Sequence, residues 1–160
     1  MRRIFIVLVV IGLAVVGCSQ EPKGQSGELI RDWEPTKYET VNNLDGVMMI
    51  VKKGTASVIG LTVIIENNSD KEITYGVDFL LEKKIKEKWY QVPFAIGGNH
   101  AFADIGYSLA SFSVREWKID WSGLYGSLNR GEYRLVKEIS NFRNTDDYDN
   151  YHLAVEFTVE

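Results

Sequence analysis

Apolar and polar side chains alternate with a period of two along most of the chain, most regularly in Ile59–Glu66 and Tyr151–Val159. Such alternation predicts β-strands with one buried face, because successive side chains of a strand point to opposite sides. Turn residues such as Asn67–Asp70 and Asn129–Gly131 separate the runs. Helical periodicity is absent apart from one short turn predicted within Ser122–Leu128. The pattern therefore indicates an all-β domain of about seven to nine strands.

The phase of each run predicts which side chains share a core between two antiparallel sheets. The predicted core residues lie on the apolar beat of their strands: Val63, Phe79, Leu81, Trp89, Trp117, Ile119, Tyr133, Leu135, Leu153, Val155 and Phe157. Three aromatic residues, Trp121, Tyr125 and Trp33, are the least expected to belong to this core. They are the candidate ligand-binding residues, and Trp121 is the foremost because it lies at a strand end beside Ser122.

The N-terminus has the layout of a secretory signal peptide. Two arginines precede the apolar stretch Ile4–Val16, which Gly17 and Cys18 follow. The stretch is shorter than the roughly 20 apolar residues that cross a bilayer. Residues 1–17 are therefore predicted to be a cleaved signal peptide.

The tetrad Val15-Val16-Gly17-Cys18 resembles the bacterial lipobox, in which a small residue precedes a lipid-modified cysteine. Val15 departs from the leucine most common there. The resemblance implies that Cys18 carries a diacylglyceryl group and anchors the mature chain at the extracytoplasmic face of the cell membrane. Two or three acyl chains anchor a protein firmly, whereas one does so marginally. Ordinary cleavage that releases a secreted protein is the alternative.

A polar stretch with Pro22, Gly24 and Pro35 follows the cysteine and lacks a strand or helix period. Residues 18–43 are therefore predicted to be a flexible tether and residues 44–160 to be the folded domain. Trp33 and Tyr38 are exceptions within the tether. We expect them to dock on the domain, with a place in a binding face as the alternative.

Short motifs from Met48 to the end of the chain resemble those of a known family. They are Glu66–Lys71, Tyr75-Gly76, Lys88–Pro93, Arg115–Trp117, Leu124–Gly126, Gly131–Arg134 and Ala154–Phe157. In this order they resemble the bacterial immunoglobulin-like (Ig-like) domain of lipoproteins and surface proteins, chiefly of Gram-positive bacteria. The resemblance implies an Ig-like antiparallel β-sandwich without catalytic residues. Leu109–Ser113 departs from the proline- and glycine-containing turn often found there.

Charge and cysteine content restrict the partners. The 160-residue chain has a net charge of −4, which becomes −6 once Arg2 and Arg3 are removed. An acidic chain disfavours nucleic acid or a bare anionic membrane as a partner, since both favour a basic surface. The single cysteine allows no internal disulfide.

Two groups of residues resemble a catalytic motif and a metal-binding motif, but neither group fits its motif well. Gly106–Ala110 nearly matches the nucleophile motif of α/β-hydrolases, with Ser108 as nucleophile and His152 as a later partner. The residues after Ser108 lead into a strand, however, and the motif requires a helix. The acidic stretch 146–150 lacks the ligand spacing of a calcium loop, although an improvised cation site stays open. His100 and His152 lack zinc-ligand spacing, so we predict no metal and no cofactor.

These observations predict a lipid-anchored, non-catalytic Ig-like module that binds an envelope protein or glycan. An envelope proteinase inhibitor is the alternative. A distant resemblance to the small sandwich of bacterial proteinase inhibitors supports it, and Phe94–Asp104 is its candidate loop. A Ser108 hydrolase is the lower alternative.

Overall fold

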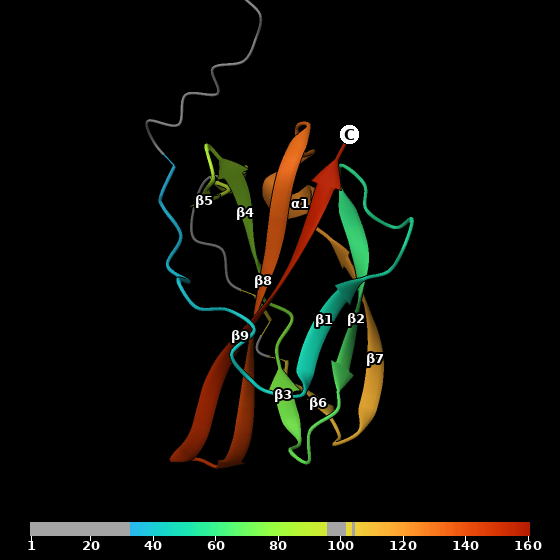
Figure 1. Ribbon diagram of the computed structural model, residues 1–160, viewed down its shortest axis with the longest axis vertical. Coiled ribbons are helices and arrows are strands. Elements are labelled where there is room, and N and C mark those ends of the chain that lie inside the picture. Colours follow the sequence, from blue (N-terminus) through green and yellow to red (C-terminus); the bar gives the residue numbers. More distant parts are fainter. Residues whose placement is uncertain (1–32, 96–101, 104) are drawn as a thin grey trace, which may run out of the picture. The chain divides into compact units, whose positions relative to one another are not determined.

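Two antiparallel sheets form the domain. The computed structural model describes residues 33–95, 102–103 and 105–160. A three-stranded sheet has the order β1 (Val47–Val51), β2 (Gly60–Asn67) and β7 (Ser113–Asp120). A six-stranded sheet has the order β5 (Lys88–Gln91), β4 (Leu80–Ile85), β8 (Gly131–Asn144), β3 (Ile73–Tyr75) and β6 (Tyr107–Leu109) (Figure 1). The strand β9 (Asp147–Val159) pairs with the other edge of β8.

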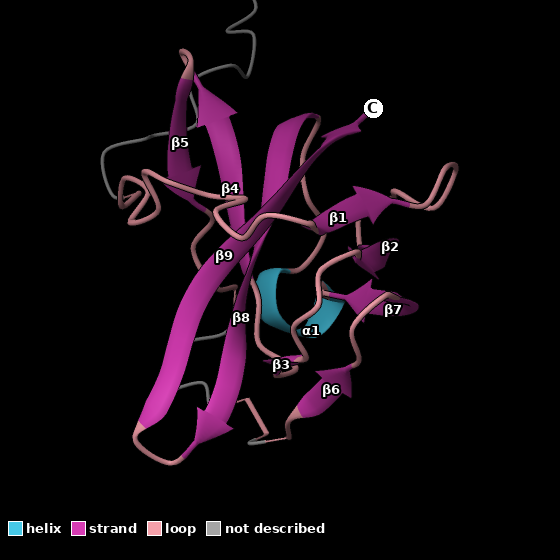
Figure 2. Cartoon of the chain, turned by 60° about the horizontal axis from the view of Figure 1, so that its bottom comes forward, coloured by secondary structure: helices cyan, strands magenta, loops and turns pink. Residues whose placement is uncertain are grey.

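The all-β, Ig-like sandwich predicted from the alternation is confirmed. In β2 every second residue is buried, and Val63 and Ile65 are fully so. The described chain is almost entirely strand and loop (Figure 2), and the predicted helical turn is α1 (Ser122–Tyr125). Among the residues that the structure describes, no helix is long and apolar enough to cross a bilayer.

Most of the predicted core is confirmed, with exceptions at two tryptophans and one valine. Eight of the predicted residues are buried: Val63, Phe79, Leu81, Ile119, Tyr133, Leu135, Leu153 and Phe157. Trp117 and Val155 are half-buried and pack against this core. Trp89 was predicted wrongly. It is half-buried on the short strand β5, where its ring lies against Arg134 at 4.8 Å.

The expectation that Trp121 and Tyr125 lie outside the core is also wrong. α1 turns the chain after β7 and directs both rings inward. Trp121 is fully buried, its ring lies 5.5 Å from that of Phe157, and its indole N–H donates to the carbonyl of Val58 at 3.0 Å. The Tyr125 hydroxyl accepts the Leu81 N–H at 3.4 Å, and burial raises the pKa of Tyr125 to about 12. Their polar atoms find partners inside the protein, which lets these aromatic residues join the core.

The β8–β9 hairpin is the longest element, with strands of 14 and 13 residues. Its far end extends away from the three-stranded sheet in both views (Figures 1 and 2). The stretch 146–150, predicted as a loop, lies at this end, and residues from Asp147 onward belong to β9.

Candidate functional site

The segment 33–43, here called the N-terminal strap, crosses the outer face of the six-stranded sheet. At one end it borders β5, where the Gln91 N–H donates to Glu34 O at 2.8 Å and Pro35 pairs with Tyr90. At the other end it borders β9, where the His152 N–H donates to Asn43 Oδ1 at 2.8 Å. The outer face of the six-stranded sheet around Arg134 is therefore covered by a segment that the sequence placed in the tether.

Residues 33–43, placed in the tether by the sequence, thus pack against the folded domain. The predicted docking is confirmed, since Trp33 packs against the core and the ring of Tyr38 lies 4.6 Å from that of His152. The alternation rule missed the strap because it is held by hydrogen bonds and by isolated side chains, not by a periodic apolar face.

An ion pair is buried under the strap. Arg134 Nε donates to Glu82 Oε2 at 2.5 Å, and the side chains of Arg134 and Glu82 are 8% and 0% exposed. The guanidinium also donates to Thr36 Oγ1 at 3.0 Å and to the carbonyl of Tyr38 at 3.1 Å. Glu82 Oε1 has no hydrogen-bond partner among the described residues. The strap therefore completes the coordination of a buried charge.

From its contact with the strap at His152 towards the projecting end, the outer face of the β8–β9 hairpin becomes exposed. We call this face the outer strip, and it consists of three directly opposed pairs: Glu138 with His152, Ser140 with Asn150, and Phe142 with Tyr148. Opposed residues of an antiparallel pair share one face of the sheet. Glu138 Oε2 lies 3.4 Å from His152 Nε2, and Ser140 Oγ donates to Asn150 Oδ1 at 2.6 Å.

The aromatic pair at the projecting end of the outer strip is widely exposed. Phe142 and Tyr148 are 54% and 52% exposed, and their rings stack with centroids 6.5 Å apart. Aromatic residues are enriched in the buried centres of protein interfaces. An exposed stacked pair on a projecting hairpin is therefore a candidate contact surface.

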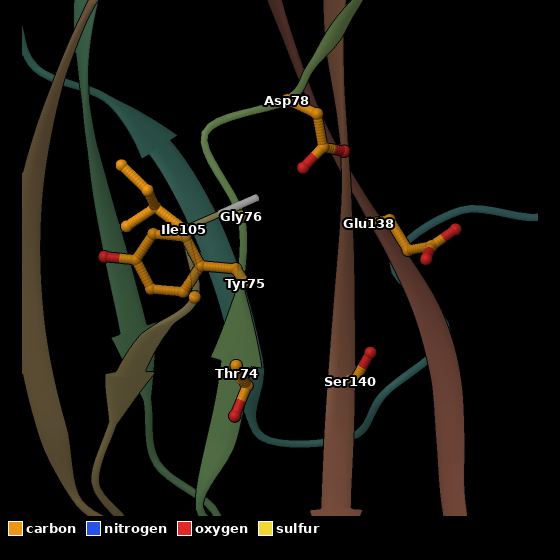
Figure 3. A pocket seen from close by; sticks show the side chains of 8 residues that line it. Thr74, Tyr75, Gly76, Asp78, Ile105, Glu138 and Ser140 are labelled. Carbon is orange, nitrogen blue, oxygen red and sulfur yellow. The ribbon is translucent and has the colours of Figure 1, made fainter. Parts of the chain in front are cut away.

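A pocket of about 250 Å³ opens beside the outer strip. It lies where β3 has ended and β4 has not begun, so this stretch of β8 has no neighbouring strand on that edge. Its lining residues are Thr74, Tyr75, Gly76, Asp78, Ile105, Gly106, Glu138 and Ser140 (Figure 3). A Cβ atom at Gly76 would lie 2.4 Å from Asp78 Oδ1, so glycine leaves room for the carboxylate in this position.

A buried lysine holds the pocket carboxylate. Lys137 is fully buried, and its amine donates to the carbonyl of Asp78 at 2.5 Å and to Asp78 Oδ1 at 3.0 Å. Burial lowers the pKa of Lys137, and the hydrogen bond to Asp78 opposes this effect. The half-exposed Asp78 side chain is thus fixed from below by an ammonium group.

Tyr38 of the strap lies between the covered and the uncovered half. Burial raises the pKa of its phenol, and the charges of Glu138, Glu82 and Asp78 raise it further. Both conditions favour the neutral form of the Tyr38 hydroxyl.

The hydrolase constellation is not brought together by the described residues. Ser108 lies in β6, where its hydroxyl donates to Glu72 Oε1 at 2.7 Å. His152 lies on β9 against Glu138, and β3 and β8 separate these two strands. His100 lies outside the described residues. So do Cys18 and residues 1–17, as well as positions 96–101 and 104 of the candidate inhibitor loop.

The acidic stretch at the hairpin end is paired with an arginine of the same chain. Arg143 donates to Asp147 from Nε at 2.7 Å and to Asp149 from Nη1 at 2.9 Å. The hydrogen bond from Arg143 holds the pKa of Asp147 below its ordinary value. Within 33–95, 102–103 and 105–160, no group of three or more His, Cys, Asp or Glu residues is arranged to hold a metal ion.

Sequence reasoning missed most of this site. Phe142 and Tyr148 lie on the polar beat of their strands, in phase with Ser140 and Asn150, and this departure from the alternation could have indicated exposed aromatic residues on one face. The pocket gave no signal, because Asp78, Ile105 and Glu138 are far apart in the sequence and meet only through the sheet order.

The fold and the site together define an Ig-like β-sandwich with one strapped and one exposed half of its larger sheet. A family model described as "Bacterial Ig-like domain" matches residues 43–158, and the chain belongs to that family. No curated protein matches the chain.

Proposed function

We propose that the mature chain is a lipid-anchored, non-catalytic binding module at the extracytoplasmic face of the bacterial cell membrane. Its outer strip contacts an envelope macromolecule, and the lipid on Cys18 retains it at the membrane. The exposed stacked pair Phe142–Tyr148 is the observation that carries this proposal. Membership of the bacterial Ig-like family supports an interaction role.

Two further features support the proposal. Arg2, Arg3 and the apolar stretch before Cys18 are typical of an exported lipoprotein. Two described side chains that could act in catalysis are engaged in structural contacts, Ser108 with Glu72 and Lys137 with Asp78. A binding role requires only the exposed face, whereas catalysis would require a free nucleophile and base.

The anchor is tested by expressing the full chain in a bacterial host and separating membranes from soluble material. We expect the chain in the membrane fraction, with an acylated Cys18 at its N-terminus by mass spectrometry. Cys18→Ala should release or misprocess the protein. A mature chain that begins at Ser19 or Gln20, with no lipid, would contradict the anchor.

The binding face is tested separately with isolated envelopes and the purified full chain. We expect the double variant Phe142→Ala/Tyr148→Ala to sediment with envelopes less than the unaltered protein. Phe112→Ala is the matched control, because Phe112 is 73% exposed and lies outside the outer strip. Equal sedimentation of all three proteins would show that the outer strip is not the binding face.

A further inference from the structure

The carboxylates of the outer strip and of its pocket each have a nitrogen partner within the protein. Asp78 pairs with Lys137 at 3.0 Å, and Glu138 Oε2 lies 3.4 Å from the imidazole Nε2 of His152. At the projecting end Arg143 binds both Asp147 and Asp149. These carboxylates would repel an anionic partner, and a cationic partner would compete for them with Lys137 and Arg143, whereas a neutral partner can accept and donate hydrogen bonds without disturbing the pairs.

Hydroxyl and amide groups cross the sheet in one row beside the pocket. Ser108 opposes Thr74, Thr74 opposes Ser140, and Ser140 opposes Asn150. Opposed side chains share a face, so these four lie on the same side of β6, β3, β8 and β9. Hydroxyl and amide groups both donate and accept hydrogen bonds, as the hydroxyl groups of a polyhydroxylated ligand require.

The pocket has the exposed apolar side chain of Ile105 on one side and polar side chains on the other. In Figure 3 Ile105 lies opposite Glu138 and Ser140, whereas Tyr75, which is only 4% exposed, belongs to the core. A pyranose ring has the same division, with C–H groups on its face and hydroxyl groups on its rim. The volume of about 250 Å³ is below the roughly 300–1,000 Å³ of pockets for drug-sized ligands. One small unit of a longer ligand therefore fits it.

The stacked pair lies one step further along the strands. Phe142 is two residues beyond Ser140, which corresponds to about 7 Å at a rise of roughly 3.4 Å per residue. An extended ligand with one unit in the pocket would place a following unit on the exposed rings of Phe142 and Tyr148. Aromatic rings offer such a unit a large contact area at little conformational cost.

From these features together we propose that the outer strip binds a neutral oligosaccharide of pyranose units. One unit occupies the pocket between Ile105 and Glu138, and a following unit lies on the Phe142–Tyr148 pair. Thr74, Ser140 and the Asp78 carboxylate bind the ring hydroxyls. The inference rests on the outer strip being the binding face of the proposed function.

The test is titration calorimetry of the purified full chain, in a detergent without a sugar headgroup, with chitotetraose and cellotetraose. Tetralysine and tetraglutamate peptides are the charged comparison probes. We expect at least one tetrasaccharide to bind and neither peptide to do so. In the presence of that tetrasaccharide, the amide resonances of Ser140 and Asn150 should shift.

Variants of the outer strip give the second readout. We expect Phe142→Ala/Tyr148→Ala to weaken tetrasaccharide binding about tenfold and Glu138→Gln to weaken it less, because the amide retains one acceptor. Phe112→Ala should bind as the unaltered protein does. Thermal unfolding of each variant shows that it is folded.

Three results would overturn the inference: neither tetrasaccharide binds, a charged peptide binds instead, or binding is unaffected by the outer-strip variants. A chain that fails to bind either sugar but still sediments with envelopes through Phe142 and Tyr148 would retain the proposed function and lose only the oligosaccharide. Retention of the Cys18→Ala variant at the membrane, or an unaltered mature chain without lipid, would contradict the anchor alone.

Discussion

The two ends of the β8–β9 hairpin contain the same side-chain combinations in different surroundings. At the end inside the sandwich, Tyr133 stacks on Phe157 at 5.7 Å and Arg134 pairs with Glu82. At the projecting end, Phe142 stacks on Tyr148 at 6.5 Å and Arg143 pairs with two aspartates. The first end is covered by the opposite sheet and by the N-terminal strap, whereas the second is open.

Burial decides what each combination contributes. A buried charge has lost its water and depends on its protein partner, so removing that partner is strongly destabilising. An exposed pair is solvated with or without its partner and adds little to stability. The same residue types therefore hold the fold at one end and are free to meet a ligand at the other. The predictions below test this contrast.

The largest effect is expected for Arg134→Ala. The variant leaves the Glu82 carboxylate buried without a counter-charge, and it also removes the hydrogen bonds to the strap. We expect a loss of about 3–5 kcal/mol in the free energy of unfolding, measured by urea denaturation. This is a large share of the roughly 5–15 kcal/mol by which most domains are stable.

The matched control is Arg143→Ala, which removes an arginine from an exposed carboxylate pair on the same strand. Its urea midpoint should stay close to that of the unaltered protein. Equal losses for the two arginines would show that the projecting end is as essential to the fold as the covered end.

A smaller effect is expected where the strap meets β9. Asn42 has a positive φ of 55°, and its side-chain oxygen accepts the N–H of Ala154 at 2.9 Å. Asn42→Ala combines a strained left-handed backbone with a lost hydrogen bond, so we expect a loss of about 2 kcal/mol. Asn42→Gly tolerates the backbone conformation and should lose less.

Hydrogen exchange at the Ala154 amide provides the local measurement for both Asn42 variants. Exchange should accelerate in each of them, since neither supplies an acceptor. An unchanged rate would mean that the strap does not protect this edge of β9.

The pH dependence of Tyr38 tests the boundary between the two halves. Its folded pKa is raised above the ordinary value of 10.0, so its contribution to stability is fully present below pH 10 and is lost as pH rises through the folded pKa. We expect the stability difference between the unaltered protein and Tyr38→Phe to be constant below pH 10 and to decrease above it. Urea denaturation at several pH values provides the measurement.

The contributions of Tyr125 and Tyr75 to the stability of the protein are also lost at alkaline pH, because burial raises the pKa of each. Both tyrosines are present in the unaltered protein and in Tyr38→Phe, so the difference in stability between these two proteins reports the contribution of Tyr38 alone. A stability difference that stays constant through the alkaline range would contradict the strapped position of Tyr38.

The sequence predicted the strands and most of the core because alternation reports one buried face directly. Val63, Leu135 and Leu153 are buried as expected. Trp121 and Tyr125 were misplaced because they follow a strand, where the period of two no longer applies. A short helical turn redirects both rings, and only the tertiary fold shows that Val58 and Leu81 satisfy their polar atoms.

The candidate site was less predictable, since it depends on the order of strands in space. Asp78 and Glu138 are on different strands or loops, and their meeting requires the gap between β3 and β4 along β8. The acidic stretch 146–150 was recognised, but its partner Arg143 was not, because the pairing requires the hairpin register at the turn. Local patterns predict faces of elements, whereas pockets and ion pairs arise from their assembly.

The smallest effect on stability is expected for the exposed pair itself. Cross-strand aromatic pairs contribute about 0.2–1 kcal/mol relative to alanine, so Phe142→Ala/Tyr148→Ala should lose no more than this in urea denaturation. Phe157→Ala, which removes one ring of the buried pair on the same hairpin, should lose about 3–5 kcal/mol. The two stacked pairs differ little in geometry, with interplanar angles of 28° and 21°. A difference in stability between these variants would therefore reflect burial. If the exposed pair proved as stabilising as the buried one, a structural role would explain why the two aromatic residues are there. The main observation for the outer strip as a binding face would then be lost.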